Sequence, residues 1–391
     1  MIHIPTKIRI RIRKRLKQYV KCGAKTLTFV FWASMYVLVM KMTIFKGNTD
    51  SQVKDWEATS SNNYSRWLAE TPVSSEDESL IDSPSSWKEP DNETLIDLEQ
   101  RLERVNHVCE TRNLASQYIS NKEFFIDHVH NIVWCNIFKA ASSAWLYNFN
   151  ILGGYKKSFL ARTREMPLIL ARKKFGRPTA EDVKEAVSTP GVVSLLIVRE
   201  PFVRLLSAYR DKIEGVTKHY FRKLAKKMIL KFRTQATKRL GPIKSSAPTF
   251  YEFVADLIQT HKTAEQNNDM FGWSNEHWAP YYKFCSPCAV NFSVIAKVET
   301  LARDSAYVIH ELGLGHVLDA RVVDKKIRLK IVENASGDGK KTSALLKYYY
   351  SQLDEHMLND LLDIYGIDFE MFGYDPAIYY CYVNKNKNCT T

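Results

Sequence analysis

Several motifs of phosphate and metal chemistry are missing from this 391-residue sequence. No Asp-x-Asp triplet occurs, the motif with which many glycosyltransferases bind a metal ion and the diphosphate of their donor. Its absence argues against those enzymes but leaves metal-independent glycosyltransferases possible. The Walker A spacing G-x-x-x-x-G-K-[ST] is absent, and so is any internal repeat. The single C-x-x-C pair, Cys285 and Cys288, has no second ligand pair at zinc spacing, which favours a disulfide role over a metal site.

The composition describes a folded and basic protein. Hydrophobic residues make up 45% and aromatic residues 12% of the chain, which excludes a mainly disordered protein. The formal net charge of +13 indicates a polyanionic partner. Charge alone does not distinguish among a nucleic acid, an anionic membrane and an acidic glycan.

The amino-terminal segment distinguishes among these partners. Residues 7–25 carry nine Lys or Arg and no acid, and an uncharged apolar run follows over 26–40. Its extension to residue 45 approaches the roughly 20 residues of a spanning helix. Because basic flanks stay cytosolic, we predict a cytosolic tail over 1–25 and a signal anchor over 26–45, with the remaining chain in the lumen and no nucleic acid as partner. A cleaved signal peptide is the alternative, but no convincing small-x-small cleavage site follows the run.

The predicted luminal part divides into a stem and a domain. Residues 46–100 are acidic and Ser-rich without a sustained apolar period, which is typical of a stem, and residues 101–391 are predicted to form the domain. Six of the seven cysteines lie beyond the anchor, where disulfides can form, and their connectivity stays open. Asn-x-Ser/Thr sequons predict glycosylation at Asn63, Asn92, Asn291, Asn334 and Asn388.

Two apolar runs rich in β-branched residues, 132–138 and 192–198, each pass directly into a helical pattern. Strand, turn and helix in this order, found twice, predict an α/β fold. We expect a parallel sheet with helices on both faces. Helical periodicity predicts further helices over residues 92–112, 249–262, 300–312 and 343–365.

The turn after the first run consists of Lys139, Ala140, Ala141, Ser142 and Ser143. Small residues let the backbone approach a ligand, and the free N–H groups of a starting helix attract an anion. The two serines supply hydroxyl groups and the lysine a positive charge, so the turn is a candidate phosphate site. The alternative is that the serines only cap the helix.

The second run ends at Arg199, at the carboxyl edge where open α/β sheets bind ligands. Pro201 fits the first turn of the helix that follows. Ser207 lies off the packed face of that helix, and we expect it to reach the same anion as Arg199. Two phosphate sites at one sheet edge predict a doubly phosphorylated nucleotide.

The segments FKAASSAW and VREPFVRLLSAYRDK resemble the two 3′-phosphoadenosine-5′-phosphosulfate (PAPS) motifs of the Golgi carbohydrate sulfotransferases, in the family of the chondroitin, dermatan and N-acetylgalactosamine (GalNAc) 4-O-sulfotransferases and the HNK-1 sulfotransferase. Residues 275–301 are similar to its HW-x-P, C-x-P-C and ETL block, and residues 365–374 to its D-F-x-x-F-x-Y segment. The resemblance covers roughly residues 107–375. It implies a P-loop-like sulfotransferase fold, Golgi localisation as a type II membrane protein, and sulfuryl transfer from PAPS to a sugar hydroxyl, most closely the 4-hydroxyl of GalNAc in chondroitin or dermatan.

The resemblance also implies roles for residues at the motif positions. Lys139, Ser142 and Ser143 would hold the 5′-phosphosulfate end, with Lys139 stabilising the leaving oxygen. Arg199 and Ser207 would hold the 3′-phosphate.

The motifs also depart from the family pattern. Phe138 and Ala144 replace a usual proline and a usual asparagine, Asn275 stands where Asp is common, and Phe292 and Ser293 stand where Tyr-Asp is common. The altered first motif motivates an alternative, a non-catalytic glycan-binding homologue.

Sulfuryl transfer needs a base to take the acceptor proton. We favour His277 in the motif HW over Glu299 and over His128 or His130. The alternative is a structural histidine packed beside Trp278. This chemistry requires no metal, and none is predicted.

Residues 217–247 contain ten Lys or Arg and no acid, and they read as a basic amphipathic helix. We expect this helix to bind a sulfated or uronate-rich glycan, although it could also be an ordinary solvated face. The predicted contacts are Lys223, Lys226, Lys227, Lys231 and Arg233.

Overall fold

The fold is taken from a computed structural model, which describes residues 90–114, 118–215, 219–269, 275–318 and 340–384. The predicted tail and anchor, most of the predicted stem, and the sequons at Asn63, Asn334 and Asn388 lie outside these ranges. Every described residue belongs to one unit of the chain, Thr71–Thr391. Within the described ranges, no helix has the length and apolar character to cross a membrane.

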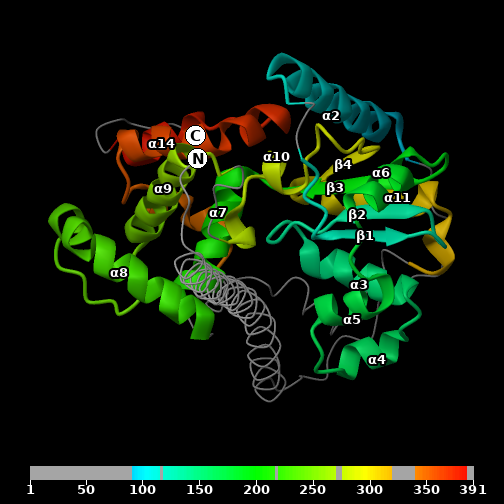
Figure 1. Cartoon of the computed structure of the whole chain (residues 1–391), viewed down its shortest axis with the longest axis horizontal. Coiled ribbons are helices and arrows are strands. Elements are labelled where there is room, and N and C mark those ends of the chain that lie inside the picture. The colour runs from blue at the N-terminus through cyan, green and yellow to red at the C-terminus, as the bar shows by residue number, and fades with distance from the viewer. Residues whose placement is uncertain (1–89, 115–117, 216–218, 270–274, 319–339, 385–391) are drawn as a thin grey trace, which may run out of the picture. The chain divides into compact units, whose positions relative to one another are not determined.

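A four-stranded sheet forms the centre of the α/β part, in the order β1-β2-β3-β4 (Figure 1). Both predicted runs form strands, β2 (Ile132–Cys135) and β3 (Val193–Val198), which are parallel to each other and to β4 (Val294–Lys297). The expectation of a wholly parallel sheet is wrong, because β1 (Phe124–Asp127) pairs antiparallel with β2. The short turn between these two strands allows a hairpin but is too short for a parallel crossover.

Helices cover both faces of the sheet. Since alternate residues of a strand point to opposite faces, each strand contributes to a core on either side. In β2, Val133 and Cys135 face one core and Ile132 and Trp134 face the other. The first core includes residues of α2 (Asn92–Thr111), α6 (Ala180–Ser188) and α10 (Tyr281–Phe284). The second core includes residues of α3 (Ser142–Leu152), α5 (Pro167–Phe175) and α11 (Leu301–Glu311).

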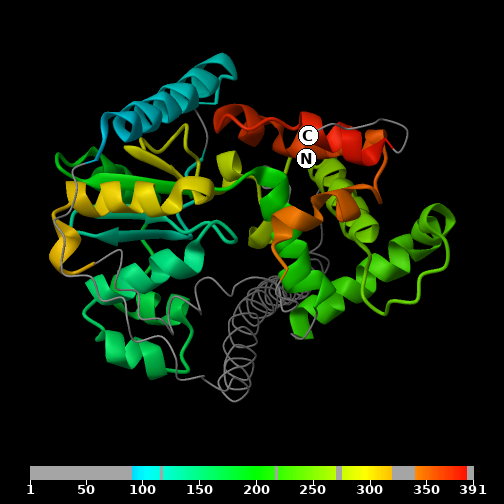
Figure 2. The same ribbon diagram turned by 180° about the vertical axis from the view of Figure 1, so that it is seen from behind.

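A third core lies beside the sheet, where helices pack on one another (Figure 2). Its centre is Phe202, whose ring contacts those of Tyr350, Tyr365, Phe369 and Tyr379. The helices of this part are α7 (Pro201–Tyr209), α8 (His219–Leu240), α9 (Phe250–Gln266), α13 (Leu346–Tyr350), α14 (Glu355–Met371) and α15 (Ala377–Val383). Shorter described helices are α4 (Lys157–Arg162), a π-helix at Arg210–Glu214, and 3-10 turns at Glu276–Trp278, Val298–Thr300, Leu314–His316 and Thr342–Leu345.

The predicted helices over 92–112, 249–262 and 300–312 are confirmed as α2, α9 and α11. The single helix predicted over 343–365 is wrong. That segment is interrupted after Tyr350, and a new helix begins where the Asp354 side chain accepts a hydrogen bond from the N–H of Met357. Aspartate competes for local backbone N–H groups in this way and therefore favours a helix start over a helix interior.

The C-x-x-C cysteines form two disulfides, each with a distant partner. Cys109 pairs with Cys288, and Cys135 pairs with Cys285. The second bond joins the last residue of β2 to the residue after α10, across 150 positions of sequence. The predicted disulfide role of the C-x-x-C pair is therefore confirmed.

We expect the double variant Cys135→Ser, Cys285→Ser to lose about 2 to 5 kcal/mol of unfolding free energy, because the disulfide restricts the unfolded chain. The measurement is urea unfolding under non-reducing conditions. The control is Cys381→Ser, since Cys381 is a free thiol among the described cysteines and is partly exposed. Equal unfolding midpoints for the double variant and the control would contradict the structural role.

Candidate functional site

The two predicted anion loops meet at one edge of the sheet. They follow β2 and β3, which are parallel neighbours, so their carboxyl ends lie side by side. The Arg199 guanidinium is 3.5 Å from the Lys139 carbonyl. The Tyr281 hydroxyl accepts a hydrogen bond from the Arg199 N–H at 3.0 Å and donates one to its carbonyl at 2.8 Å, which fixes the backbone there.

The backbone of the first loop is strained. Lys139 and Ala141 have φ angles of 69° and 58°, in the left-handed region that glycine favours. A non-glycine residue there costs about 1 to 3 kcal/mol, and such strain is concentrated at functional sites. The cap position of α3 is Ala141, without a side-chain cap, so the alternative that the serines cap this helix is wrong. An uncapped amino end of a helix is an anion site.

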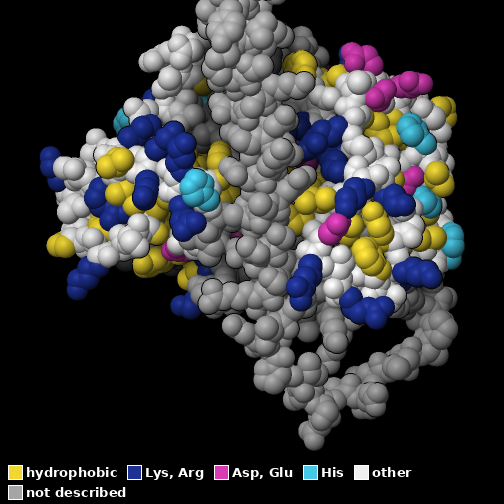
Figure 3. Space-filling view, turned by 60° about the horizontal axis from the view of Figure 1, so that its bottom comes forward, with side chains coloured by type: hydrophobic (Ala, Val, Ile, Leu, Met, Phe, Trp, Pro, Cys, Tyr) yellow, Lys and Arg dark blue, Asp and Glu magenta, His cyan; other side chains and the backbone are white. Residues whose placement is uncertain are grey.

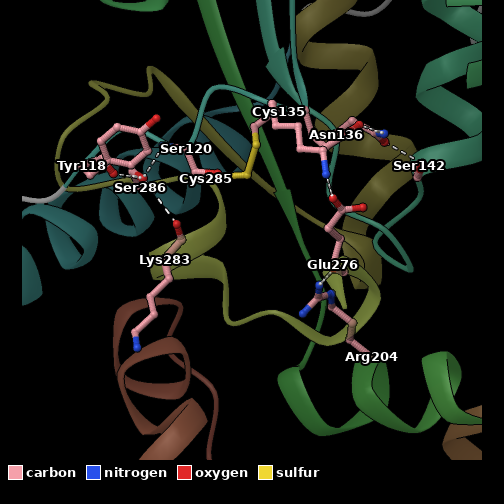
Figure 4. Close-up of a disulfide and its surroundings, with 12 residues drawn as sticks. Tyr118, Ser120, Cys135, Asn136, Ser142, Arg204, Glu276, Lys283, Cys285 and Ser286 are labelled. Atoms are coloured by element: carbon pink, nitrogen blue, oxygen red, sulfur yellow. Dashed lines mark hydrogen bonds and ion pairs between the residues drawn. A yellow bond between two sulfur atoms is a disulfide. The ribbon is translucent and has the colours of Figure 1, made fainter. Parts of the chain in front are cut away.

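Ser142 points away from the cap position, toward a buried asparagine. Its Oγ donates to Asn136 Oδ1 at 2.6 Å, and Asn136 Nδ2 donates to Glu123 Oε2 at 3.3 Å. Figure 4 shows Asn136 between Ser142 and the disulfide at Cys135. Asn136 is fully buried. Sequence reasoning gave it no role, although a polar residue within an apolar run could have pointed to one. The hydrogen bond gives the loop its shape.

Arg204, on α7, connects the first loop to the segment that contains His277. Its guanidinium donates to the carbonyls of Phe138 at 2.9 Å and Ala279 at 2.8 Å. A longer contact of 3.5 Å joins it to the Glu276 carbonyl (Figure 4). The group is 4.5 Å from the centre of the Tyr281 ring, and Arg204 is 1% exposed. One buried side chain therefore sets the spacing between both parts of the site.

Lys139 shares a carboxylate with a second lysine. Asp211 Oδ2 accepts from Lys139 Nζ at 3.0 Å and from Lys212 Nζ at 2.9 Å. Burial lowers the pKa of Lys139, and Asp211 offsets this only in part. Burial would raise the pKa of Asp211, but the two lysines hold it well below its usual range. Asp211 and Lys212 stand in the second motif, yet sequence reasoning gave them no role.

His277 is buried in the 3-10 turn Glu276–Trp278 and stacks on Phe138, with 4.5 Å between ring centres. The Oδ1 atom of Asn275 accepts from the His277 N–H at 3.0 Å and contacts Nδ1 at 2.6 Å, so Nδ1 carries the proton. Burial, together with Lys212, lowers the pKa of His277 well below its ordinary value. The imidazole is therefore neutral near pH 7, with a lone pair on Nε2.

The other candidate bases are less suitable. His128 and His130 lie in the β1–β2 turn, at the opposite end of β2 from Lys139, and His130 is bound to Asp127 at 2.6 Å. The structure excludes both as bases at this site. Glu299 lies at the correct sheet edge, but one of its oxygens accepts from Tyr374 and the other from the Glu200 N–H.

The remaining predicted residues lie near this edge or on the surface. Ala140 is buried in the loop before α3, and Ser143 is partly exposed in the first turn of α3. Ser207 is buried in the second turn of α7. The sequon residues Asn92 and Asn291 are both exposed. In the described part of the chain, no group of three or more His, Cys, Asp or Glu side chains is arranged to hold a metal ion.

The predicted basic helix is confirmed as α8, and Figure 3 shows many Lys and Arg side chains on that side of the molecule. Lys223, Lys226 and Lys227 are exposed. Lys231 pairs with Asp256 at 3.3 Å. Arg233 pairs with Glu252 at 2.6 Å and also donates to the carbonyls of residues 245 and 247. Lys231 and Arg233 are therefore held by contacts within the protein. The exposed Lys223, Lys226 and Lys227 face solvent, where a ligand could reach them.

Comparisons with known proteins agree with the resemblance. The sequence model of the Sulfotransferase family matches residues 122–375. Carbohydrate sulfotransferase 11 of Rattus norvegicus is 26% identical over 296 residues, which cover 73% of this chain and 78% of that protein. Carbohydrate sulfotransferase 14 of Danio rerio is 28% identical over 297 residues, 73% of each chain, and carbohydrate sulfotransferase 10 of Homo sapiens is 25% identical over 309 residues, 74% of this chain and 80% of that one. No solved structure matches.

We expect Arg204→Lys to lower the free energy of unfolding by about 2 to 4 kcal/mol, because lysine cannot reach both carbonyls and each buried unbonded group costs about 1 to 3 kcal/mol. The measurement is urea unfolding. The control is Arg177→Lys at an exposed arginine, which should change stability by no more than about 0.5 kcal/mol. Equal stabilities of the two variants would show that the buried contacts of Arg204 are dispensable.

Proposed function

Since the chain belongs to the Sulfotransferase family, we propose that it transfers a sulfuryl group from PAPS to a hydroxyl group of a carbohydrate. The observation that carries this proposal is the meeting of the Lys139 and Arg199 loops at one sheet edge, within the matched residues. The relatives named carbohydrate sulfotransferases support a sugar as the acceptor.

The donor has two anionic ends, and the two loops suit them in a P-loop-like arrangement of strand, loop and helix. We assign the 5′-phosphosulfate end to Lys139 and the residues up to Ser143, at the uncapped start of α3. The 3′-phosphate is assigned to Arg199 and Ser207. Burial keeps water away from both basic side chains, which strengthens their attraction to an anion.

Transfer is an in-line displacement at sulfur. The acceptor oxygen forms a new S–O bond while the S–O bond to the 5′-phosphate breaks, and that electron pair stays on the phosphate oxygen. Lys139 stabilises this developing charge. Nε2 of His277 takes the hydroxyl proton, and the products are a sulfate ester and 3′-phosphoadenosine 5′-phosphate (PAP).

Two departures from the family pattern fit this role of His277. Phe138, in place of a proline, supplies the ring on which His277 stacks. Asn275, in place of an aspartate, gives Nδ1–H a neutral partner. A neutral amide keeps the resting ring neutral and oriented, whereas an aspartate would also stabilise the imidazolium that forms on proton uptake.

For the acceptor, we propose a chondroitin- or dermatan-like glycan, sulfated at the 4-hydroxyl of GalNAc, that also contacts Lys223, Lys226 and Lys227. A type II membrane protein of the Golgi, held by residues 26–45, would meet such glycans in the lumen. The support is the resemblance of the four motifs, the basic amino-terminal segment and the exposed lysines of α8.

We expect the wild-type protein to transfer ³⁵S from labelled PAPS to desulfated chondroitin or dermatan, with the label on GalNAc by disaccharide analysis. His277→Gln should lower kcat by about 100- to 10,000-fold, because proton transfer is lost, and leave the Kd for PAP unchanged. The control is His316→Gln at an exposed histidine, which should keep full activity. Absence of transfer by the wild type to any glycan would overturn the proposed function, and full activity of His277→Gln would make this histidine structural.

We expect the triple variant Lys223→Glu, Lys226→Glu, Lys227→Glu to raise the KM for the glycan and leave the KM for PAPS unchanged. The wild-type KM for the glycan should also rise with salt beyond physiological strength, where the Debye length is about 8 Å. The matched control is Lys184→Glu on α6, which is likewise exposed. If the KM for the glycan is equally insensitive to salt in the wild type, the triple variant and Lys184→Glu, the lysines of α8 only face solvent.

A further inference from the structure

Lys139, Lys212 and Asp211 form a triad in which the carboxylate is more exposed to solvent than the two lysines. The two ammonium groups share one oxygen of Asp211, at 3.0 and 2.9 Å. The lysine side chains are 12% and 14% exposed, whereas the Asp211 side chain is 41% exposed. The carboxylate is therefore the solvent-accessible member of the triad, and the ammonium groups lie beneath the surface.

A π-helix places Asp211 and Lys212 at this position. The turn Arg210–Glu214 directly follows α7 and is closed by a bond from the Gly215 N–H to the Arg210 carbonyl at 3.3 Å. Such widened turns are rare in proteins overall, and those that occur are often found at functional sites.

The same turn brings Lys212 near the candidate base. The Lys212 ammonium lies 5.7 Å from the centre of the Phe221 ring. That ring meets His277 edge to face, with 5.9 Å between centres. Lys212 therefore lies close both to Lys139, through the shared carboxylate, and to His277.

The charges of this cluster do not balance. Two largely buried ammonium groups face one carboxylate, whereas the nearby charge of Arg199 has Glu299 and Glu200 beside it. A buried positive charge is costly unless an anion compensates it. The arrangement therefore suits an anion that binds between the lysines, where a single carboxylate oxygen now lies.

Resting on the proposed function, we propose that Lys212 is a second catalytic lysine, which contacts the oxygens of the transferring sulfuryl group. Asp211 is a positioning residue that holds Lys139 and Lys212 together until the donor binds. The sulfuryl oxygens then replace the carboxylate oxygen between the two ammonium groups. Asp211 takes no proton and forms no bond to sulfur, so the balance of the displacement is unchanged.

The test compares Lys212→Ala, Lys212→Gln and Asp211→Asn in the whole protein, with Lys184→Ala as the exposed control. PAP lacks the sulfuryl group, so its Kd reports the nucleotide site alone, while kcat with PAPS reports the sulfuryl site. Both Lys212 variants should lower kcat about 100-fold or more, as loss of one charge-stabilising group does, and should retain the wild-type Kd for PAP. Asp211→Asn should lower the KM for PAPS several-fold, because a competing anion is removed. Lys184→Ala should change neither quantity.

Wild-type kcat in both Lys212 variants would overturn the assignment of Lys212. A loss of PAP affinity that parallels the loss of kcat would also overturn it, since it would indicate a disturbed nucleotide site. A higher KM for PAPS in Asp211→Asn would contradict the exchange of anions. A wild-type protein that neither binds PAP nor transfers sulfate would contradict the proposed function itself, and this inference would fall with it, whereas failure confined to the variants leaves the function standing.

Discussion

The site depends on the hydrogen bonds of one buried guanidinium. Arg204 binds the carbonyl of Phe138, directly before Lys139, and the carbonyl of Ala279, directly after the HW pair. These two segments are far apart in sequence, and Phe138 and Ala279 pack in the same core against one face of the sheet. A planar fork with several donors can satisfy carbonyls in fixed directions, which an ammonium group cannot do. Through this one side chain, the donor loop and His277 keep a constant separation.

Other contacts reinforce the same junction from both sides. The disulfide between Cys135 and Cys285 joins the two segments covalently, one residue before Asn136. Asn136 in turn connects Ser142 to Glu123, whose carboxylate is held by Arg172 at 3.3 Å. The loop can therefore keep a left-handed backbone, because its flanks are fixed independently of any ligand. Such pre-organisation is what stabilisation of developing charge requires.

The sequence predicted the parts of this architecture that local patterns specify. Strands β2 and β3, helices α2, α8, α9 and α11, and the closeness of the two anion loops follow from periodicity and from the rule that parallel strands share a carboxyl edge. The antiparallel β1 was missed because its four residues give little periodic signal. The disulfide pairing, the role of Arg204 and the Lys139–Asp211–Lys212 triad depend on contacts between distant segments. No pattern along a single segment encodes such contacts, and the π-turn that positions two members of the triad has no simple sequence signature.

The central claim is that the two loops together form one site for a doubly phosphorylated nucleotide. Calorimetric titration of the wild-type protein with PAP, adenosine 5′-phosphate and adenosine 3′-phosphate tests it most directly. Two phosphate sites predict that PAP binds much more tightly than either monophosphate, because each monophosphate leaves one basic loop without its anion. Equal affinity of PAP and adenosine 5′-phosphate would contradict the account, since the loop at Arg199 would then bind no phosphate.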